Sequence, residues 1–599
     1  MENELKTAKK RSEIDDSFKW QLSDIYSTDE AWENDFTYLK EHMNEIDGFK
    51  GTLTNSSDDL LKALTRIDEL SLIMERLYVY AHMRKDEDNS VSKYQGMTDR
   101  AMSLNVELSS KTAFVDPEIL SAPNDTITKF IEENAGLEPF DFYLTSLMRS
   151  KEHILDEKME EVMALTHEMA SAPKTIFTML NNVDLQFGTV KDEDGNTVEL
   201  THGRYGDLMR SNDRTVREQT FKQFYKEFGD HTNTIAGTLN GSVKAGLFYT
   251  RMRKFNTPLE ASLFSDNVPV SVYDNLIKVI NDGLPKLHEY FDVKRKALGL
   301  DEMHMYDIYA PIESKEAKDK IPFENAKDIL LSGLAPLGEE YKGLLETAFR
   351  DKWMDVYENT GKTSGAYCWG VYGTHPFVLL NYQDNLDSVF TIAHELGHAM
   401  HSHYSDTSLP YSKAQYTIFV AEVASTVNEV LLNYYMLKTT KDKEKRIAII
   451  HHFIEQFRTT LFRQTMFAEY EKTIHNAAME GTPLTADYLT QTYYDLNKKY
   501  HENIVCDEEI GLEWSRIPHF YNSFYVYKYA TGFSAAVAIA KNVLDNGDKD
   551  GYIKMLQSGG SDYPIELLKL AKVDMSTTKP IEDCLAVFGE MVDMLKELV

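Results

Sequence analysis

The residues best suited to chemistry in this 599-residue chain lie between Asp387 and Tyr404, where the sequence reads DSVFTIAHELGHAMHSHY. Apolar residues recur through this stretch at helical spacing, which predicts an α-helix. Residues four apart share one face of a helix, with Cβ atoms about 5–6 Å apart, so His394 and His398 can bind one metal ion. Glu395 follows the first histidine and points to one side, which leaves it free to take a proton from a metal-bound water.

Two imidazoles do not complete a metal site. The H-E-x-x-H pattern that residues 394–398 form also arises by chance on solvated, histidine-rich helices. The metzincin pattern would supply a Gly seven residues and a His ten residues after His394. Those positions hold His401 and Tyr404 in this chain, so that class is excluded. We expect His401 and His403 to be exposed or packed histidines and not ligands.

A following helix offers the third ligand. The stretch from Ala414 to Leu437 has apolar residues at helical spacing, and Glu422 lies inside its apolar run. A carboxylate there loses hydration unless it has a positive partner, and a zinc ion held by two histidines and one glutamate is such a partner. Glu429, two turns further on, is either an ordinary surface residue or a hydrogen-bond acceptor for a ligand imidazole.

Longer motifs surround this core: KWQLSDIY near the start, GAYCWGVYGTHPFVLLNY before the helix, and RIPHFYNSFYVYKYATG after it. Together with HELGH and FVAEVASTVNE, they make the chain resemble the thimet oligopeptidase family of zinc metallopeptidases, specifically its oligoendopeptidase F branch. The resemblance implies that His394, His398 and Glu422 bind one zinc ion per chain. It implies that Glu395 is the catalytic base.

The resemblance also implies a fold and a domain organisation. The fold would be mostly α, a large multi-helical zincin-like metallopeptidase with a small β-sheet near the active site and a deep substrate channel. A helical N-terminal region would occupy residues 1–200 and a catalytic domain residues 201–599. Within the first, an oligoendopeptidase F N-terminal-like domain is expected over roughly residues 115–185. Because folded proteins cannot enter a deep channel, the expected substrates are short peptides.

Apolar periodicity predicts further helices over Asp58–Lys85, over Ser92–Ala113 and from near Leu155 onward, packed helix on helix. Leu185–Leu200 alternates on either side of an Asp-Gly pair and predicts a β-hairpin. The acidic, lysine-rich segment Glu313–Lys320 predicts a loop or linker.

Two short strands are predicted between Gly365 and Tyr382, where aromatic and β-branched residues flank a Gly-Thr-His-Pro turn. A peptidase needs its substrate extended, and adding a strand to an exposed sheet edge recognises main chain. We therefore expect one of these strands to pair with substrate. The alternative is that both strands are purely structural.

Hydrolysis of an amide requires donors aimed at the developing oxyanion, and RIPHFYNSFYVYKYATG holds suitable side chains. The resemblance implies that His519 and the pair Tyr525 and Tyr527 contact substrate and stabilise the transition state. Tyr521 is an uncertain match, because the interval after the histidine is shorter than in the thimet branch. Packing alone also explains several of these aromatic residues.

Composition narrows the function. A net charge of −32 argues against binding to nucleic acid or to anionic membranes. No secretory signal or bilayer-spanning run is present, and the basic KKR at residues 9–11 predicts a solvated tail. Cys368, Cys506 and Cys584 are too far apart and too few for a disulfide framework, which favours free thiols and a cytoplasmic protein.

The predicted function is a zinc-dependent metalloendopeptidase that hydrolyses internal bonds of short oligopeptides. One alternative is a carboxypeptidase or dipeptidyl carboxypeptidase, which needs Arg516 or a lysine to bind a terminal carboxylate. Another is a non-catalytic helical peptide-binding protein, whose structural metal would need four protein ligands and no base. Cleavage preference, oligomeric state and the exchange of zinc for another metal are open from sequence.

Overall fold

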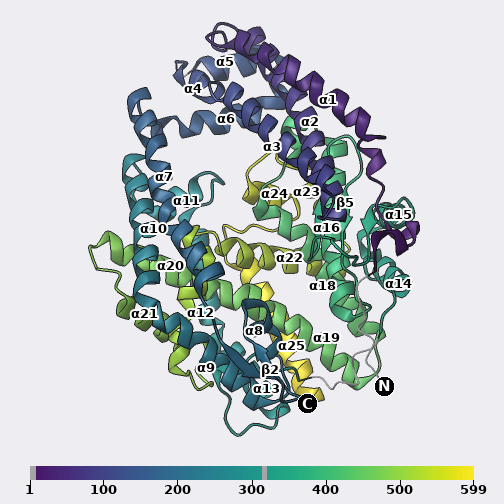
Figure 1. Cartoon of the computed structure of the whole chain (residues 1–599), viewed down its shortest axis with the longest axis vertical. Helices are drawn as coiled ribbons and strands as arrows, with labels where there is room; N and C mark the ends of the chain where they lie inside the picture. Colours follow the sequence, from purple (N-terminus) through teal and green to yellow (C-terminus); the bar gives the residue numbers. More distant parts are fainter. Residues whose placement is uncertain (1–8, 124, 313–319) are drawn as a thin grey trace. The chain divides into compact units, whose positions relative to one another are not determined.

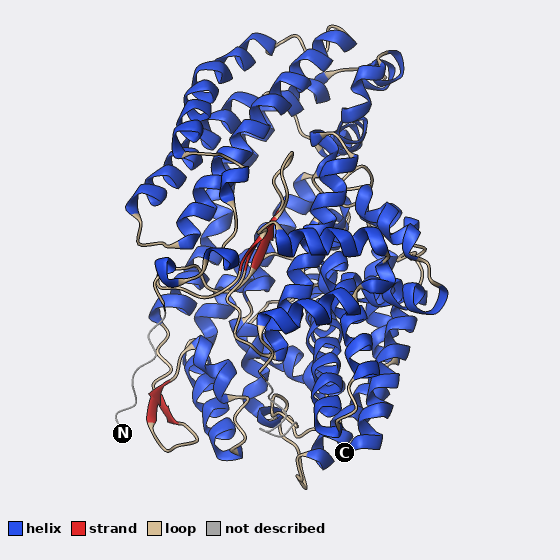
Figure 2. Ribbon diagram, turned by 90° about the vertical axis from the view of Figure 1, so that its right-hand side faces the viewer, coloured by secondary structure: helices blue, strands red, loops and turns tan. Residues whose placement is uncertain are grey.

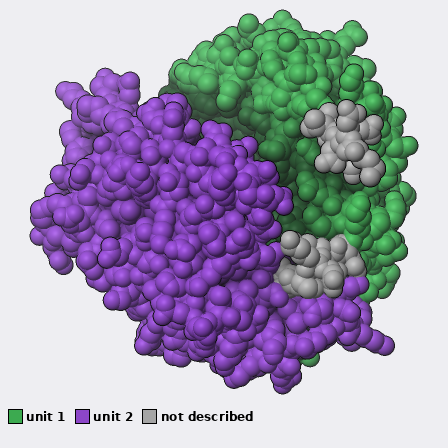
Figure 3. All heavy atoms as spheres, turned by 60° about the horizontal axis from the view of Figure 1, so that its bottom comes forward, with its two compact units in different colours: residues 1–152, 319–435, 539–573 green, residues 153–318, 436–538, 574–599 purple. Residues whose placement is uncertain are grey.

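The computed structural model describes residues 9–123, 125–312 and 320–599. The chain forms two compact units (Figure 3). Unit 1 comprises residues 1–152, 319–435 and 539–573, and unit 2 comprises residues 153–318, 436–538 and 574–599. Each unit combines stretches that are distant in sequence, and the predicted division at residue 200 stays a prediction. The predicted loop at Glu313–Lys320 lies almost wholly outside the described residues.

Helices make up most of both units (Figures 1 and 2). Each helix is assigned to the unit that contains its first residue. Those of unit 1 are α1 (Asp29–His42), α2 (Ser57–Glu87), α3 (Ser92–Thr112), α4 (Val115–Ser121), α5 (Thr126–Glu133), α6 (Asp141–Arg149), α14 (Phe323–Gly333), α15 (Glu339–Arg350), α16 (Leu386–Ser408), α17 (Tyr411–Ala414), α18 (Ile418–Thr439), α23 (Lys549–Gln557) and α24 (Pro564–Leu570). Those of unit 2 are α7 (Glu157–Met179), α8 (His202–Leu208), α9 (Arg214–Asp230), α10 (Thr232–Met252), α11 (Pro258–Phe264), α12 (Val270–Asp282), α13 (Leu284–Ala297), α19 (Lys443–Gln456), α20 (Arg463–Met479), α21 (Ala486–Tyr500), α22 (Tyr527–Asn546) and α25 (Lys579–Leu598).

The predicted helices and hairpin are confirmed. Helix α2 begins where the Ser56 side chain accepts a hydrogen bond from the Asp59 backbone amide, an N-cap that satisfies one otherwise unpaired donor. Helices α3 and α7 also match their predicted positions. In unit 2, strands β1 (Thr189–Lys191) and β2 (Thr197–Glu199) pair antiparallel around the predicted turn.

Unit 1 contains a three-stranded sheet in the order β3-β5-β4. The central strand β5 (Phe377–Leu379) is buried and pairs antiparallel with β4 (Tyr367–Trp369), so both predicted strands are present. The third strand, β3 (Met354–Asp355), pairs parallel with β5 and was not predicted, because two residues carry no readable alternation. Strand β4 therefore lies at an edge of this sheet.

The N-terminal KWQLSDIY motif belongs to the core of unit 1. Trp20 is 5% exposed, packs with residues of α2 and β5, and donates a hydrogen bond of 2.9 Å from Nε1 to Oε1 of Glu87. Arg11 forms ion pairs with Asp355 at 2.6 Å and with Glu87 at 2.9 Å. The predicted solvated tail is therefore wrong at Arg11, because two buried carboxylates require a nearby positive charge.

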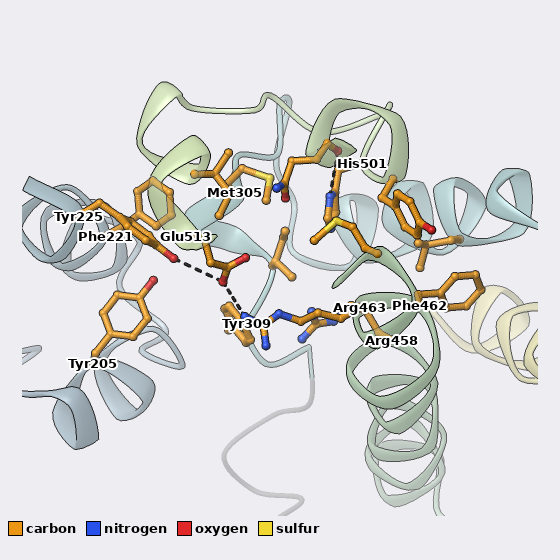
Figure 4. Close-up of a pocket in the computed structure, with 16 residues that line it drawn as sticks. Tyr205, Phe221, Tyr225, Met305, Tyr309, Arg458, Phe462, Arg463, His501 and Glu513 are labelled. Atoms are coloured by element: carbon orange, nitrogen blue, oxygen red, sulfur yellow. Dashed lines mark hydrogen bonds and ion pairs between the residues drawn. The ribbon is translucent and has the colours of Figure 1, made fainter. Parts of the chain in front are cut away.

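Unit 2 contains a buried cluster of charged and aromatic side chains around a small cavity (Figure 4). Arg463 donates to Glu513 at 2.6 Å, and the Tyr493 hydroxyl donates to the other oxygen of the same carboxylate at 2.5 Å. Arg458 forms a second pair, with Glu455 at 2.7 Å. These pairs place opposite charges together where water is excluded, which is the condition under which buried ions are tolerated.

No helix among the described residues combines the length and apolar character that spanning a bilayer requires. Cys368, Cys506 and Cys584 are all free cysteines, as predicted.

Candidate metal centre and active site

Helix α16 carries the HELGH motif in unit 1. Its N-cap is Asn385, whose side chain accepts a 2.8 Å hydrogen bond from the Ser388 amide. Apolar residues at helical spacing bury one side of the helix in the core. His394 and His398 lie one turn apart, and their Nε2 atoms are 3.2 Å from each other. The two imidazoles thus converge as the spacing predicts.

Helix α18 brings Glu422 to the same place. Its Oε2 atom lies 3.5 Å from Nε2 of His394 and 3.8 Å from Nε2 of His398. The candidate ligand atoms of the three residues all lie within 4.8 Å of one another. The described part of the chain therefore offers two imidazole nitrogens and one carboxylate oxygen around a single point.

These separations fit one zinc ion. Zinc is bound tetrahedrally at about 2.0–2.2 Å by nitrogen and oxygen, which sets neighbouring ligand atoms roughly 3.3–3.6 Å apart. The three separations of 3.2, 3.5 and 3.8 Å fall on and around that interval. Three protein ligands, with a further position left for water or substrate, are typical of catalytic zinc sites and not of structural ones.

Close packing of α16 on α18 makes this convergence possible. A Cβ atom at Gly397 would lie 2.6 Å from the Ala424 carbonyl oxygen and 2.5 Å from the Ser425 Cα, so only glycine lets the backbones approach this closely. The Asn428 side-chain amide donates a 3.0 Å hydrogen bond to the Ala393 carbonyl oxygen and accepts one of 2.8 Å from Tyr341. The glycine and this buried amide fix the register of one helix against the other.

Glu429 orients the first histidine. The Nδ1 atom of His394 donates to Oε1 of Glu429 at 2.6 Å, which directs Nε2 toward His398 and Glu422. Burial alone would lower the pKa of His394, but the hydrogen bond and charge of Glu429 outweigh it and raise that pKa to about 9. Of the two interpretations of Glu429 from sequence, the geometry matches the hydrogen-bond acceptor.

Glu395 lies beside the ligands without joining them. Its residue is 7% exposed, and burial raises the pKa of its carboxyl to about 7, with the charges of Glu422 and Glu429 adding to the rise and His394 opposing it. Glu395 is therefore a buried carboxyl that lies next to the candidate ligands and is not one of them. On strand β4, Cys368 is close enough that the charge of Glu395 adds to the effect of burial and raises the thiol pKa.

The other histidines of α16 lie outside the metal cluster. His401 is buried and stacks on the Tyr416 ring at 3.6 Å. His403 packs against Trp353, with ring centroids 5.8 Å apart. Both are packed histidines, in line with the expectation.

In unit 2, the predicted oxyanion donors fall into two environments. The rings of His519, Tyr525 and Tyr529 form one half-buried cluster, with centroids 5.5–6.2 Å apart. Tyr527 is 0% exposed and packs against Tyr273 at 5.3 Å. Tyr529 lies in the same short aromatic motif as Tyr525 and Tyr527, and that crowding is the signal that could have added Tyr529 to the candidates.

Tyr521, the uncertain match, lies elsewhere in unit 2. Its hydroxyl shares a 2.6 Å hydrogen bond with the Thr238 hydroxyl, and its ring stacks on Phe177 at 4.3 Å. Both contacts are internal to the unit, so packing accounts for this tyrosine.

A mostly helical fold, two histidines and a glutamate around one point, and an adjacent buried glutamate define a zincin-like metallopeptidase. The family model described as Peptidase family M3 matches residues 207–587, and the model described as Oligopeptidase F matches residues 118–187. The chain belongs to peptidase family M3 and is a metalloendopeptidase.

Individual relatives extend over nearly the whole chain. Oligopeptidase PepF of Bacillus subtilis is 46% identical over 592 residues, covering 98% of this chain and 88% of the relative. Group B oligopeptidase PepB of Streptococcus agalactiae is 38% identical and covers 98% of both. The crystal structure of oligoendopeptidase-F from Enterococcus faecium is 36% identical, with a TM-score of 0.73 over 95% of this chain and 99% of its own. A Chlamydophila abortus crystal structure is 35% identical, with a TM-score of 0.94 over 99% of this chain and 100% of its own.

Proposed function

We propose that this chain is a zinc-dependent endopeptidase that hydrolyses internal bonds of short oligopeptides. The observation that carries the proposal is the convergence of Nε2 of His394, Nε2 of His398 and Oε2 of Glu422 at 3.2–3.8 Å, beside an unliganded Glu395. The names of the Bacillus, Streptococcus and Enterococcus relatives, all oligopeptidases or oligoendopeptidases, support the substrate class.

The roles follow from position. His394, His398 and Glu422 would hold one zinc ion, which when bound acts as a Lewis acid toward water and the scissile carbonyl. Glu395 removes a proton from the attacking water and returns it to the leaving amide nitrogen. Glu429 keeps the His394 ring in the orientation and tautomer that binding requires.

The proposal takes the oxyanion donors from the motif RIPHFYNSFYVYKYATG. His519 and Tyr525 match the motif and belong to the half-buried ring cluster, whereas Tyr527 matches the motif but is fully buried. A donor must reach the substrate oxygen, so burial favours His519 and Tyr525. Tyr529 completes the same cluster and is the residue we add to the candidates.

Strand β4 is the candidate for substrate main-chain pairing. It lies at the edge of the β3-β5-β4 sheet and packs on α16, the helix that carries the metal ligands. Main-chain pairing at an edge accepts many sequences, because the hydrogen bonds are independent of side chains. That property suits an enzyme of peptide turnover.

The alternatives have less support. A carboxypeptidase needs a cation for the terminal carboxylate, but Arg516 lies 3.6 Å from Glu513 and stacks over Tyr205 and Phe224. A structural metal needs a fourth ligand, and the group formed by the described residues has three. Three free cysteines and a net charge of −32 support a cytoplasmic site of action, with peptides as partners and not nucleic acid or membrane.

The test pairs metal analysis with product analysis. Wild type should contain one zinc per chain, cleave blocked and free peptides internally, and lose both zinc and activity with a chelator. Glu395→Gln should keep the zinc and lose roughly 10²–10⁴ in kcat, the usual contribution of general base catalysis. Exposed Glu346→Gln is the matched control. A Glu395→Gln protein with full activity, or products trimmed only from the C-terminus, would contradict the proposal.

A further inference from the structure

Unit 1 contains a second feature on the helix that carries the metal ligands. A cavity of about 550 Å³ lies among α2, α3, β4, α16, α17 and the two residues that follow α17. Its volume is within the range of about 300–1,000 Å³ that small-molecule and side-chain sites occupy. None of the residues described so far as metal ligands or catalytic groups lines it.

Two carboxylates face this cavity. Glu75 projects from α2 and Asp406 from α16, and no lysine, arginine or histidine occurs among the described residues of its lining. Glu75 is held in place by hydrogen bonds from the Tyr411 hydroxyl and the Tyr372 backbone amide. Asp406 has no hydrogen bond or ion pair with any described residue. A half-buried carboxylate without a partner is costly, and a cation entering the cavity would compensate it.

The electrostatics agree with this placement. Burial, followed by the charge of Glu75, raises the pKa of Asp406 to about 7. Burial also raises the pKa of Glu75, although Tyr411 and the nearby Arg76 oppose the rise. The guanidinium of Arg76 is turned to the Tyr372 carbonyl oxygen at 3.0 Å and does not line the cavity. No cation among the described residues lines the cavity, so a bound ammonium or guanidinium group would lower both pKa values and favour the ionised carboxylates.

Aromatic rings provide the remaining recognition surface. Tyr78 and Trp369 meet edge to face at 6.0 Å, and both line the cavity together with Tyr411 and Tyr416. Aromatic faces attract ammonium and guanidinium groups and cover their aliphatic stems. Carboxylates together with aromatic rings suit a lysine or arginine side chain better than a metal ion, which would prefer oxygen ligands throughout.

The cavity continues along the catalytic helix. His398, Ser402 and Asp406 occupy successive i+4 positions of α16, and Ser402 Oγ is hydrogen-bonded to the Tyr416 hydroxyl at 2.8 Å. Eight helical residues span about 12 Å, which an extended peptide covers with three to four residues. Gly370, the residue after strand β4, also lines the cavity, and a Cβ atom there would lie 2.7 Å from the Ser402 Cβ and 3.7 Å from an Asp406 oxygen.

We propose that this cavity is a substrate subsite for a lysine or arginine side chain, three to four residues from the cleaved bond, with Glu75 and Asp406 facing the cation. The inference rests on the proposed peptidase function and adds a substrate class to it: peptides with a basic residue at a fixed distance from the scissile bond.

The test uses pairs of blocked peptides that carry arginine or its uncharged analogue citrulline, moved one position at a time along both sides of the cleaved bond. Wild type should favour arginine at one position by roughly tenfold or more in kcat/KM, as expected for a partly desolvated charge pair. Glu75→Gln and Asp406→Asn should each reduce that ratio, and the double variant should abolish it. Cleavage of the citrulline peptides should not change, which a merely structural role would not predict.

Asp68→Asn is the matched control, because Asp68 is a half-buried carboxylate of α2 that does not line the cavity. Calorimetry of the same peptides with Glu395→Gln protein measures binding without turnover. If wild type cleaves citrulline peptides but never prefers arginine, the subsite proposal is wrong and the peptidase proposal stands. If arginine peptides bind more tightly but no peptide is hydrolysed, the peptidase proposal is wrong and the subsite proposal stands. A preference that survives in the double variant overturns the assignment of Glu75 and Asp406.

Discussion

The backbone of Gly397 in α16 lies directly against the Ala424 carbonyl of α18, so that a methyl group at residue 397 would sit 2.6 Å from that oxygen. The contact sets how closely Glu422 approaches the two histidines. Residue 397 is one of the two unspecified positions of the H-E-x-x-H pattern, and in this chain the helix packing requires it to be glycine.

Gly397→Ala should therefore separate the helices and weaken the metal site. Overpacking of this kind costs about 1–3 kcal/mol, and a shift of a few tenths of an ångström at Glu422 should lower zinc affinity as well. Zinc titration against a competing chelator and a thermal melt measure both effects. Gly96→Ala in α3 is the control: a Cβ there meets nothing within 4 Å, so it should be neutral or stabilising. Unchanged zinc affinity in Gly397→Ala would separate helix packing from metal binding.

Glu429→Gln should weaken zinc binding without removing a ligand. It takes away the charge that holds Nδ1–H of His394 at 2.6 Å, and loss of such a partner typically costs 10–100-fold in metal affinity or activity. The dissociation constant for zinc and kcat should be measured together, with exposed Glu346→Gln as control. Wild-type values of the dissociation constant and of kcat would indicate that Glu429 is an ordinary surface residue, the other interpretation that the sequence permits.

Glu513→Gln should destabilise unit 2. Burial alone would raise the pKa of Glu513, but Arg463 and Arg516 outweigh it and lower that pKa to about 2. Removing the charge leaves both arginines uncompensated, at a cost of about 3–5 kcal/mol. Because the folded pKa is below the unfolded one, the contribution is full above about pH 4.5 and is lost toward pH 2. Melting temperatures of wild type and variant should converge on acidification, whereas exposed Glu508→Gln should match wild type throughout.

Glu471→Gln should have the opposite effect on stability. Burial raises the pKa of Glu471 to about 8, although its carboxylate accepts a 2.9 Å hydrogen bond from the Phe524 amide. The folded state therefore keeps a proton that the unfolded state releases above pH 4.5. The stability that this proton contributes is full below pH 4.5 and is lost as the pH rises through about 8. The neutral amide avoids that loss, so the variant should gain on the order of 1 kcal/mol or more over wild type at pH 9. Exposed Glu480→Gln is the control, and thermal melts at pH 9 make the measurement. Equal melting temperatures for wild type and Glu471→Gln at that pH would refute the raised pKa.

Substitutions in RIPHFYNSFYVYKYATG should distinguish side chains that contact substrate from those that only pack in the core. His519→Ala and Tyr525→Phe should each lower kcat by roughly 10²–10³, the usual cost of removing one oxyanion donor, with little change in melting temperature. Tyr527→Phe should leave kcat within about twofold of wild type, because its ring is fully buried. The reverse pattern, with Tyr527 essential and Tyr525 dispensable, would mean that unit 2 rearranges around substrate.

Sequence periodicity was a good guide wherever an element is long. The helices α2, α3, α7 and α16 repeat their apolar residues over enough turns to be recognised without tertiary contacts. Helix α18 was expected from Ala414 but begins at Ile418, because its start depends on neighbouring elements more than on pattern. Strand β3 was missed, since a two-residue strand exists only through its pairing with β5. Arg11 was misread as solvated because its partners, Asp355 and Glu87, are distant in sequence.

The sequence by itself determined which residues can do the chemistry: the spacing of His394 and His398 follows from helix geometry, and the apolar surroundings of Glu422 mark it as a carboxylate in need of a cation. Tertiary structure alone decided the ligand separations, the contact of Gly397 with α18, and the meeting of Glu75 with Asp406 across a cavity. The reason is physical. Local spacing fixes angles within one helix, whereas distances between helices depend on packing among residues far apart in the chain.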